Sequence, residues 1–174
     1  CLERVYNCRK LLCEFFNGYG YDRVVFTKNC TEALNIAIFG TLHYGDEVVT
    51  TVAEHNSVLR PLESLKGRGV KVHYAPLNVK GEVDISALLH FVTPKTRAVI
   101  ITLASNVTGT SPDISVLRKV IPESTLLICD GAQACGHIKI DMKGSGIDAL
   151  AVAGHKGMLG IQGSGALLFS ERFN

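Results

Sequence analysis

The sequence lacks several features that would each assign it to a class of protein. Its 174 residues contain no apolar run approaching the roughly 20 residues of a membrane-spanning helix, and no secretory signal peptide is visible. Lysine and arginine form no run that suggests nucleic acid or an acidic membrane, since 18 basic residues are balanced by 16 acidic ones. The six cysteines form no C-x-x-C pair, which argues against zinc. We therefore expect no metal, no nucleic-acid partner and no membrane.

The composition that remains is that of a folded globular domain. Hydrophobic residues make up 47% of a chain long enough for one sizeable core, so we expect a single domain over residues 1–174. Because the chain starts without methionine and stops just after an apolar run, we expect a domain excised from a longer protein. Cys8, Cys13 and Cys129 fall within predicted helices and strands, where we expect small buried apolar residues. Unpaired cysteines of this kind indicate a reducing compartment, and we expect the cytoplasm.

Apolar runs and helical patterns alternate along the chain. Strands are predicted at residues 23–27, 47–52, 70–75, 97–103, 125–129, 147–152 and 165–169, with a short extended piece at 137–140. Helices are predicted at residues 2–16, 31–42, 56–66, 84–92 and 114–121, with Pro61 tolerable only near the first turn of its helix. This alternation predicts an α/β fold, a three-layer sandwich around a mostly parallel seven-stranded sheet. The last strand follows a glycine-rich loop of about a dozen residues, short for a helical crossover, so we expect it to be antiparallel.

In such a sheet, ligands gather at the carboxyl ends of the strands. Five predicted strands end in polar segments, at residues 27–32, 53–55, 105–110, 130–133 and 154–156. The first of these leads into a helix, whose free backbone amides and dipole suit a phosphate, and the Thr31 hydroxyl can add a contact. An ordinary helix cap is the alternative for that turn. All five ends are expected to converge on one crevice.

Three of these strand ends carry side chains that could take part in catalysis or ligand binding. Lys156 follows a core strand, where poor solvation makes its amine a candidate nucleophile; a lysine in a flexible surface loop is the alternative. Asp130 follows a strip of pure hydrocarbon and needs a cationic or donor partner, unless it only caps the turn before Gly131. His55 could stack on a flat ligand or move protons, or simply start a helix. Together they describe a site for pyridoxal 5′-phosphate, with Lys156 as the Schiff-base lysine and Asp130 at the pyridinium nitrogen.

Five stretches of the sequence also carry a family resemblance. Residues 29–35, 45–49 with 54–58, 105–109, 130–134 and 154–157 resemble, in order, those of the cysteine desulfurase and selenocysteine lyase family, class V aminotransferase enzymes of pyridoxal-phosphate fold type I. The resemblance implies the large domain of an enzyme that removes sulfur or selenium from L-cysteine or selenocysteine to give alanine. It also implies a homodimer and a sulfur-acceptor protein. The family's N-terminal segment, its C-terminal small domain, its loop cysteine and its substrate-binding arginine have no match in this chain.

The resemblance implies roles for residues around the cofactor ring. Lys156 is expected to be the catalytic Schiff-base lysine and proton shuttle, and His55 to stack on the ring and assist acid–base steps. Asp130 is expected to pair with the ring nitrogen, and Gln133 with the phenolic oxygen. Asn106 is expected near the substrate carboxylate and the ring oxygen.

The resemblance places Cys30, Thr31 and His155 around the phosphate. Two positions depart from the family pattern: Cys30 stands where threonine is common and Ala153 where serine is common. Each missing hydroxyl is expected to weaken phosphate binding by about 1 kcal/mol. The loop at 157–160 also departs from the more frequent aromatic-containing form. Because the loop cysteine and the substrate-binding arginine have no match here, we expect this chain alone to bind the cofactor weakly and to turn over little or nothing.

Three other functions stay open at this point. Another class V enzyme, such as an aminotransferase, epimerase or lyase, differs mainly in residues that this chain does not contain. A Rossmann-type nucleotide-binding module predicts G-x-G-x-x-G after the first strand, but residues 27–32 contain no glycine. A non-catalytic domain on the same fold is disfavoured by the presence of Lys156 and Asp130.

Overall fold

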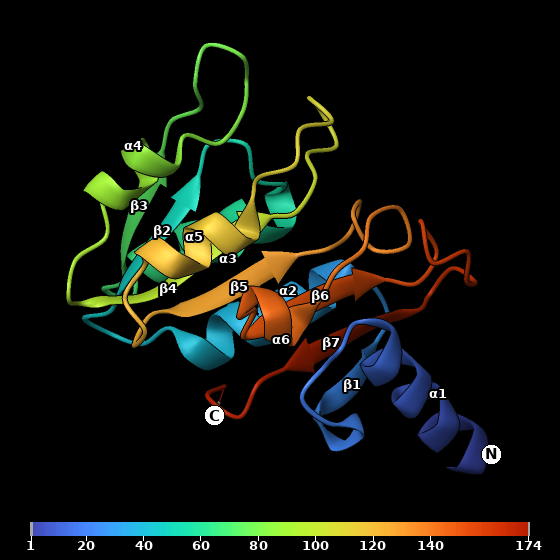
Figure 1. Ribbon diagram of the computed structural model, residues 1–174. Helices are drawn as coiled ribbons and strands as arrows, with labels where there is room; N and C mark the ends of the chain where they lie inside the picture. The colour runs from blue at the N-terminus through green and yellow to red at the C-terminus, as the bar shows by residue number, and fades with distance from the viewer. Residues whose placement is uncertain (1, 174) are drawn as a thin grey trace.

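The computed structural model describes residues 2–173, which form one seven-stranded sheet with helices on both faces (Figure 1). Across the sheet the strand order is β1-β7-β6-β5-β4-β2-β3. The strands are β1 (Val24–Thr27), β2 (Glu47–Thr51), β3 (Lys71–Ala75), β4 (Thr96–Thr102), β5 (Leu126–Asp130), β6 (Ala149–Ala153) and β7 (Gly165–Phe169). Only β7 is antiparallel to its neighbours, β1 and β6. The predicted α/β sheet and its reversed last strand are therefore confirmed.

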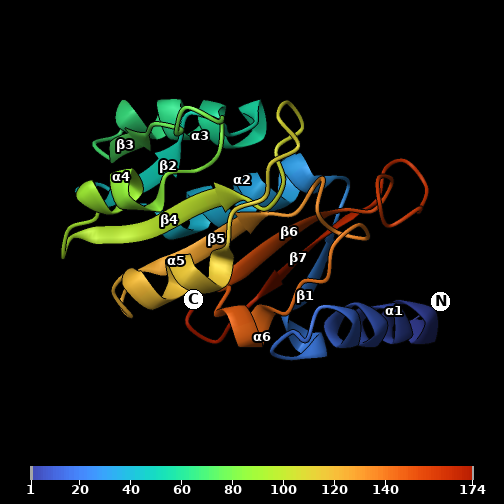
Figure 2. The same cartoon turned by 45° about the horizontal axis from the view of Figure 1, so that its top comes forward.

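The helices form the outer two layers, as Figure 2 shows. They are α1 (Leu2–Phe15), α2 (Cys30–Thr41), α3 (Asn56–Lys66), α4 (Ile85–His90), α5 (Ile114–Val120) and α6 (Met142–Ser145), with a 3₁₀ turn η1 (Tyr21–Arg23). Buried side chains of α2 and α3 pack on one face of the sheet, and those of α4, α5 and α6 pack on the other. The sheet is thus covered on both sides at its centre.

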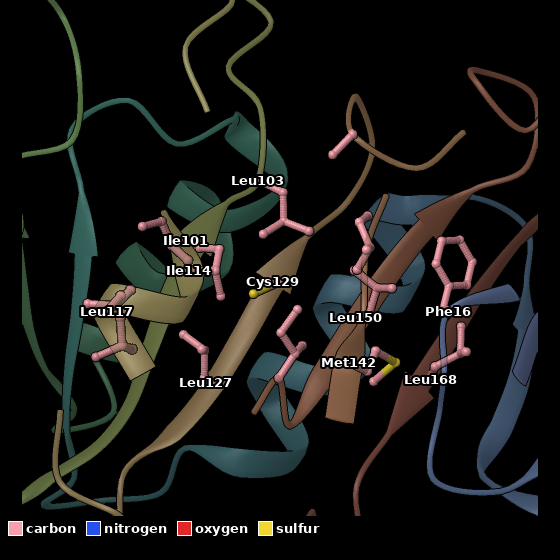
Figure 3. Packing of buried hydrophobic residues seen from close by; sticks show 14 of the residues in the cluster. Phe16, Ile101, Leu103, Ile114, Leu117, Leu127, Cys129, Met142, Leu150 and Leu168 are labelled. Carbon is pink, nitrogen blue, oxygen red and sulfur yellow. The ribbon is translucent and has the colours of Figure 1, made fainter. Parts of the chain in front are cut away.

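The central strands explain why the sequence reads as apolar runs. Every residue of β5 and of β6 is buried. In β5, Leu127 and Cys129 face the α5 side, where Figure 3 shows them with Leu117, while Leu126 and Ile128 face the α2 side. A strand buried on both faces gains nothing from polar alternation, so it carries a continuous apolar run.

The first helix corrects one prediction. Cys129 is buried as expected and Cys13 is half-buried, but Cys8 is exposed. The helix α1 lies at the β1 edge of the sheet (Figure 1), and none of its residues is buried. Its apolar side chains, including Leu2 at 87% exposure and Leu11 at 65%, remain largely open. The helical periodicity of residues 2–16 correctly predicted a helix with an apolar face. It did not predict that this face would remain largely exposed among the described residues.

Three local details also differ from the sequence-based expectation. Pro61 lies in the second turn of α3, buried, where its missing N–H leaves the carbonyl of Ser57 without its usual helical partner. Residues 137–140 form no strand and contribute only an isolated bridge between Cys135 and Ile138. The helix α6 has only 4 residues, too few to show a helical period, and begins at the cap Asp141.

Two negative findings apply to residues 2–173. None of the helices in that range combines the length and the apolarity needed to cross a bilayer. Within the same range, no group of three or more histidine, cysteine, aspartate or glutamate side chains is arranged to hold a metal ion.

Candidate functional site

One cavity opens where β4, β5 and β6 end and where α2 and α3 begin. Its volume is about 260 Å³. All residues singled out from the sequence as site candidates line it: Cys30, Thr31, His55, Asn106, Asp130, Gln133, His155 and Lys156. The predicted convergence of distant strand ends is therefore what the structure shows, while the role of each side chain stays a prediction.

Six further residues line the cavity and were not among the site candidates. They are Asn29, Ser57, Thr102, Ala104, Ala132 and Ala153. Ala153 ends β6 with a methyl group where the resembling family commonly has a hydroxyl. Thr102 ends β4, and its hydroxyl is already bonded to the carbonyl of Ala104 at 2.9 Å. Each lies within four positions of a predicted site residue, which was the one clue that the sequence offered.

The start of α2 supplies an anion-binding end to the cavity. The helix cap is Asn29, whose side-chain oxygen accepts from the N–H of Glu32 at 2.8 Å. The helix therefore begins at Cys30, one residue earlier than predicted, and Thr31 is free of the capping role. Unpaired N–H groups and the positive end of the helix dipole at this point favour a phosphate.

Asp130 forms the floor of the cavity at the end of β5. Its residue is 3% exposed, and it pairs in register with Thr102 of β4 and Ala151 of β6. Its Oδ1 accepts from the Ala132 N–H at 2.8 Å and from the Cys30 thiol at 3.4 Å. No described residue donates a hydrogen bond to Oδ2. A buried carboxylate with one open oxygen needs a donor, and the protonated ring nitrogen of pyridoxal phosphate fits that need.

The Cys30 thiol contacts the acidic group of the site. The sequence placed it only at the phosphate, but its sulfur donates to Asp130 instead. Burial above all, and then the neighbouring Asp130 charge, raise the pKa of this thiol far above its ordinary value. Cys30 therefore remains a neutral hydrogen-bond donor and is a poor nucleophile.

His55 joins a short chain of polar side chains that links the two helix starts. It caps α3 with Nδ1, which accepts from the Ser57 N–H at 3.1 Å. The Ser57 hydroxyl lies 2.8 Å from the same nitrogen and 2.8 Å from Thr31 Oγ1. His55 itself is exposed on the cavity side, whereas Ser57 is buried.

Glu54, the residue before His55 in the sequence, carries a buried carboxyl group. It is 5% exposed, and its Oε1 accepts from the Thr51 hydroxyl at 2.6 Å. Its Oε2 is also buried, and none of residues 2–173 offers it a hydrogen bond. Burial above all, with a smaller contribution from the Asp130 charge, raises the pKa of this carboxyl to about 8. Below that pH the group is neutral, which removes the cost of an unpaired buried charge.

Lys156 lies in the loop between β6 and β7, over the cavity. The prediction that it is poorly solvated is wrong, because the residue is exposed and follows the end of β6 by three positions. The loop is held by glycine contacts: the Gly160 N–H donates to the Gly154 carbonyl at 2.7 Å. A side chain at Gly136, where φ is +86°, would clash with the carbonyl of Gly157 next to the lysine. This close approach fixes the backbone that carries Lys156.

The chain is similar to known proteins along its whole length. The family model "Aminotransferase class-V" matches residues 2–174. A probable cysteine desulfurase of Pyrococcus abyssi is 33% identical over 95% of this chain and 42% of its own length. A second, from Methanothermobacter thermautotrophicus, is 36% identical over 97% of this chain and 42% of its own length.

Solved structures give the same result for the fold. The apo cysteine desulfurase from Thermococcus onnurineus NA1 superposes with a TM-score of 0.91 at 30% identity, covering 98% of this chain and 44% of that one. The cystine C-S lyase C-DES, in complex with its product cysteine persulfide, superposes with a TM-score of 0.89 at 25% identity, covering 99% of this chain and 49% of that one. The chain thus spans less than half the length of these proteins. It belongs to the class-V aminotransferase family, and the resemblance read from its sequence is confirmed.

Proposed function

We propose that this protein holds pyridoxal 5′-phosphate through a Schiff base with Lys156 and forms the large domain of an enzyme that releases sulfur from L-cysteine. The observation that carries the proposal is the open oxygen of Asp130. It is buried at the floor of a cavity whose rim carries a lysine, on the neighbouring strand end. An acid at the ring nitrogen and a lysine for the aldehyde are the two protein groups that this cofactor requires.

When bound, the cofactor supplies an electron sink that stabilises negative charge on the substrate. The side chains of this chain do the rest. Asp130, hydrogen-bonded in the sheet, keeps a proton on the ring nitrogen by its charge. Lys156 holds the aldehyde carbon and moves a proton near it, and Gln133 bonds the ring's phenolic oxygen. His55, at the start of α3, would stack on the ring.

Other residues of the same cavity would bind the cofactor phosphate and the substrate. The free amides of α2 with Thr31, together with His155, bind the phosphate, and Cys30 supports Asp130 by its thiol hydrogen bond. Asn106, which follows β4 and lines the cavity, would contact the substrate carboxylate. No residue of this chain matches the family's sulfur-attacking thiol or the arginine that binds the substrate carboxylate. Both would come from the part of the enzyme that corresponds to the rest of the relatives' length.

A C–S lyase acting on cystine is the second candidate. It is favoured by the structural likeness to C-DES, whose product is cysteine persulfide. For either activity we propose a homodimer, and for the desulfurase a protein that accepts the sulfur. The cytoplasm is our proposal for the compartment, although two similar proteins are named as mitochondrial and mitosomal cysteine desulfurases.

Trapping with borohydride tests the cofactor proposal. The protein is incubated with pyridoxal phosphate, reduced, digested and mapped by mass spectrometry, and the label is expected on Lys156. Lys156→Ala should abolish the specific label, whereas Lys28→Ala, at an exposed lysine beside the start of α2, should keep it. A label on other lysines in preference to Lys156 contradicts the proposal. Alanine and sulfide from L-cysteine, compared with persulfide and pyruvate from L-cystine, then separate the two activities in the full-length enzyme.

A further inference from the structure

Thr31, Ser57 and His55 form a hydrogen-bonded chain from the start of α2 to the start of α3. The Thr31 and Ser57 hydroxyl oxygens are 2.8 Å apart, and Ser57 Oγ is 2.8 Å from His55 Nδ1. Contacts of this length between such atoms each require one shared proton. Ser57 is 7% exposed, so water offers no ready substitute for either contact.

When the cavity holds no anion, a backbone N–H decides which of the three side chains donates and which accepts in these hydrogen bonds. The Ser57 N–H donates to His55 Nδ1 at 3.1 Å, so Nδ1 is an acceptor and the neutral imidazole carries its proton on Nε2. Ser57 must then donate to Nδ1, and Thr31 must donate to Ser57. A hydroxyl has one proton, so Thr31 presents only lone pairs to the cavity.

A phosphate at the start of α2 requires the opposite direction. Its oxygens only accept hydrogen bonds, so Thr31 must turn its proton toward them. Thr31 then accepts from Ser57, and Ser57 accepts from His55. For that, Nδ1 must take up a proton from water while Nε2 releases its own proton to water, so the net change on the ring is a switch of tautomer. The lost bond from the Ser57 N–H to Nδ1 opposes this change and holds the first arrangement until an anion binds.

We propose that Ser57 is a positioning residue that couples phosphate binding at Thr31 to the location of the proton on His55. The proposal rests on the proposed function, in that the phosphate is the one carried by the cofactor. Its consequence is chemical. With phosphate in place, His55 Nε2, which has no partner among the described residues, presents a lone pair and can accept a proton. Without phosphate the same nitrogen can only donate.

Other charged groups near His55 must be held constant in a test. Asp130, His155 and Lys156 line the same cavity, Glu54 precedes His55 in the chain, and Arg60 of α3 lines the adjoining hollow with it. Pyridoxal and pyridoxal 5′-phosphate both engage Lys156 and Asp130 and differ only in the phosphate. Comparing these two aldehydes isolates the effect of the anion on His55.

The experiment is ¹⁵N NMR of the protein labelled at histidine, at one fixed pH, with His55→Gln used to assign the signals. Absorbance of the Schiff base reports binding of each aldehyde separately. With pyridoxal, His55 Nδ1 should keep the shift of an unprotonated nitrogen. With pyridoxal 5′-phosphate it should move far upfield, to the shift of a protonated one, and Nε2 should move in the opposite sense.

Variants locate the coupling in Ser57. In Ser57→Ala the phosphate should no longer change the His55 shifts, although the Schiff base still forms. Ser115→Ala is the matched control, because Ser115 holds the same position in α5 and bonds the cap Asp113 through both N–H and hydroxyl. It should behave as the unaltered protein. Thr31→Val, which breaks the chain at its other end, should also uncouple His55 and serves if Ser57→Ala does not fold.

The outcomes separate this proposal from the proposed function. Schiff base formation with identical His55 shifts for both aldehydes overturns the coupling but leaves the cofactor site intact. A Ser57→Ala variant that still responds to phosphate overturns the role of Ser57. If neither aldehyde forms a Schiff base, the proposed function fails. Inorganic phosphate then serves as the probe, and unchanged His55 shifts at saturating phosphate overturn the coupling as well.

Discussion

Replacing the buried Glu54 by glutamine should remove a loss of stability that accompanies rising pH. The carboxyl is 5% exposed, and burial raises its pKa from the ordinary 4.5 to about 8. The folded protein therefore holds a proton over a range in which the unfolded chain has released it. Under this condition the free energy of unfolding falls as pH increases.

The structure sets the size and the window of this effect. Between about pH 4.5 and about pH 8, each pH unit costs slightly more than 1 kcal/mol, because one pKa unit corresponds to that free energy. The sum over the window is on the order of 5 kcal/mol, a large part of the 5 to 15 kcal/mol that is typical of a folded domain. Below the window both states are protonated, and above it both are ionised, so the Glu54 contribution is constant there.

Urea denaturation of the protein and of Glu54→Gln, at several pH values from about 5 to about 8, measures the effect. Glutamine keeps the shape and can accept from Thr51, but it does not ionise. The variant should gain stability relative to the parent as pH rises, by slightly more than 1 kcal/mol per unit. Glu63→Gln, at an exposed glutamate of α3 whose pKa is lowered, is the control and should show no such trend. Parallel profiles for the protein and Glu54→Gln would refute the reasoning.

Three further predictions concern groups elsewhere in the structure. Asp148→Asn should lower the free energy of unfolding by about 3 kcal/mol in urea, because it removes the buried charge that faces two arginines; a loss under about 1 kcal/mol contradicts this. Gly136→Ala should lower the melting temperature by several degrees, because φ is +86° and the added carbon meets the Gly157 backbone; an unchanged melting curve contradicts it. Cys8 should react with a thiol reagent in the native protein while Cys30 reacts only after unfolding, so equal rates would contradict the burial described.

The fold was predictable because its central strands are buried on both faces. The runs that became β4, β5 and β6 could not be placed at the surface without exposing large apolar areas, and their bounds fall within two residues of the prediction. The same reasoning failed for α1. Its periodic face matches that of a core helix, yet no residue of α1 is fully buried, and only Leu12 and Cys13 pack partly against the core. Periodicity reports that a face is apolar, and it does not report what covers that face.

The site was predictable as a set of strand ends but not as a set of contacts. Polar residues after several parallel strands must meet at one edge, so Asp130 and Lys156 could be paired from sequence alone. The contact between Thr31 and Ser57 could not, because it joins residues 26 positions apart and depends on α2 and α3 lying side by side. Likewise, the Cys30 thiol faces Asp130 only because α2 lies against β5 and β6, across a sequence separation of 100.

Asp130 and Lys156 occupy the same edge of the sheet in two different mechanical settings. Asp130 still belongs to β5, flanked by strands on both sides, and two donors fix its Oδ1. Its open oxygen therefore has little freedom, as suits a group that must hold one ring atom electrostatically through every step. Lys156 lies beyond the end of β6, exposed on a loop whose backbone is fixed by glycine packing while its side chain remains free. A lysine that forms and releases a covalent bond must move between two positions, so the free side chain of Lys156 is compatible with the proposed role. Of the two environments that the sequence allowed, a poorly solvated strand end and a surface loop, the structure shows the surface loop.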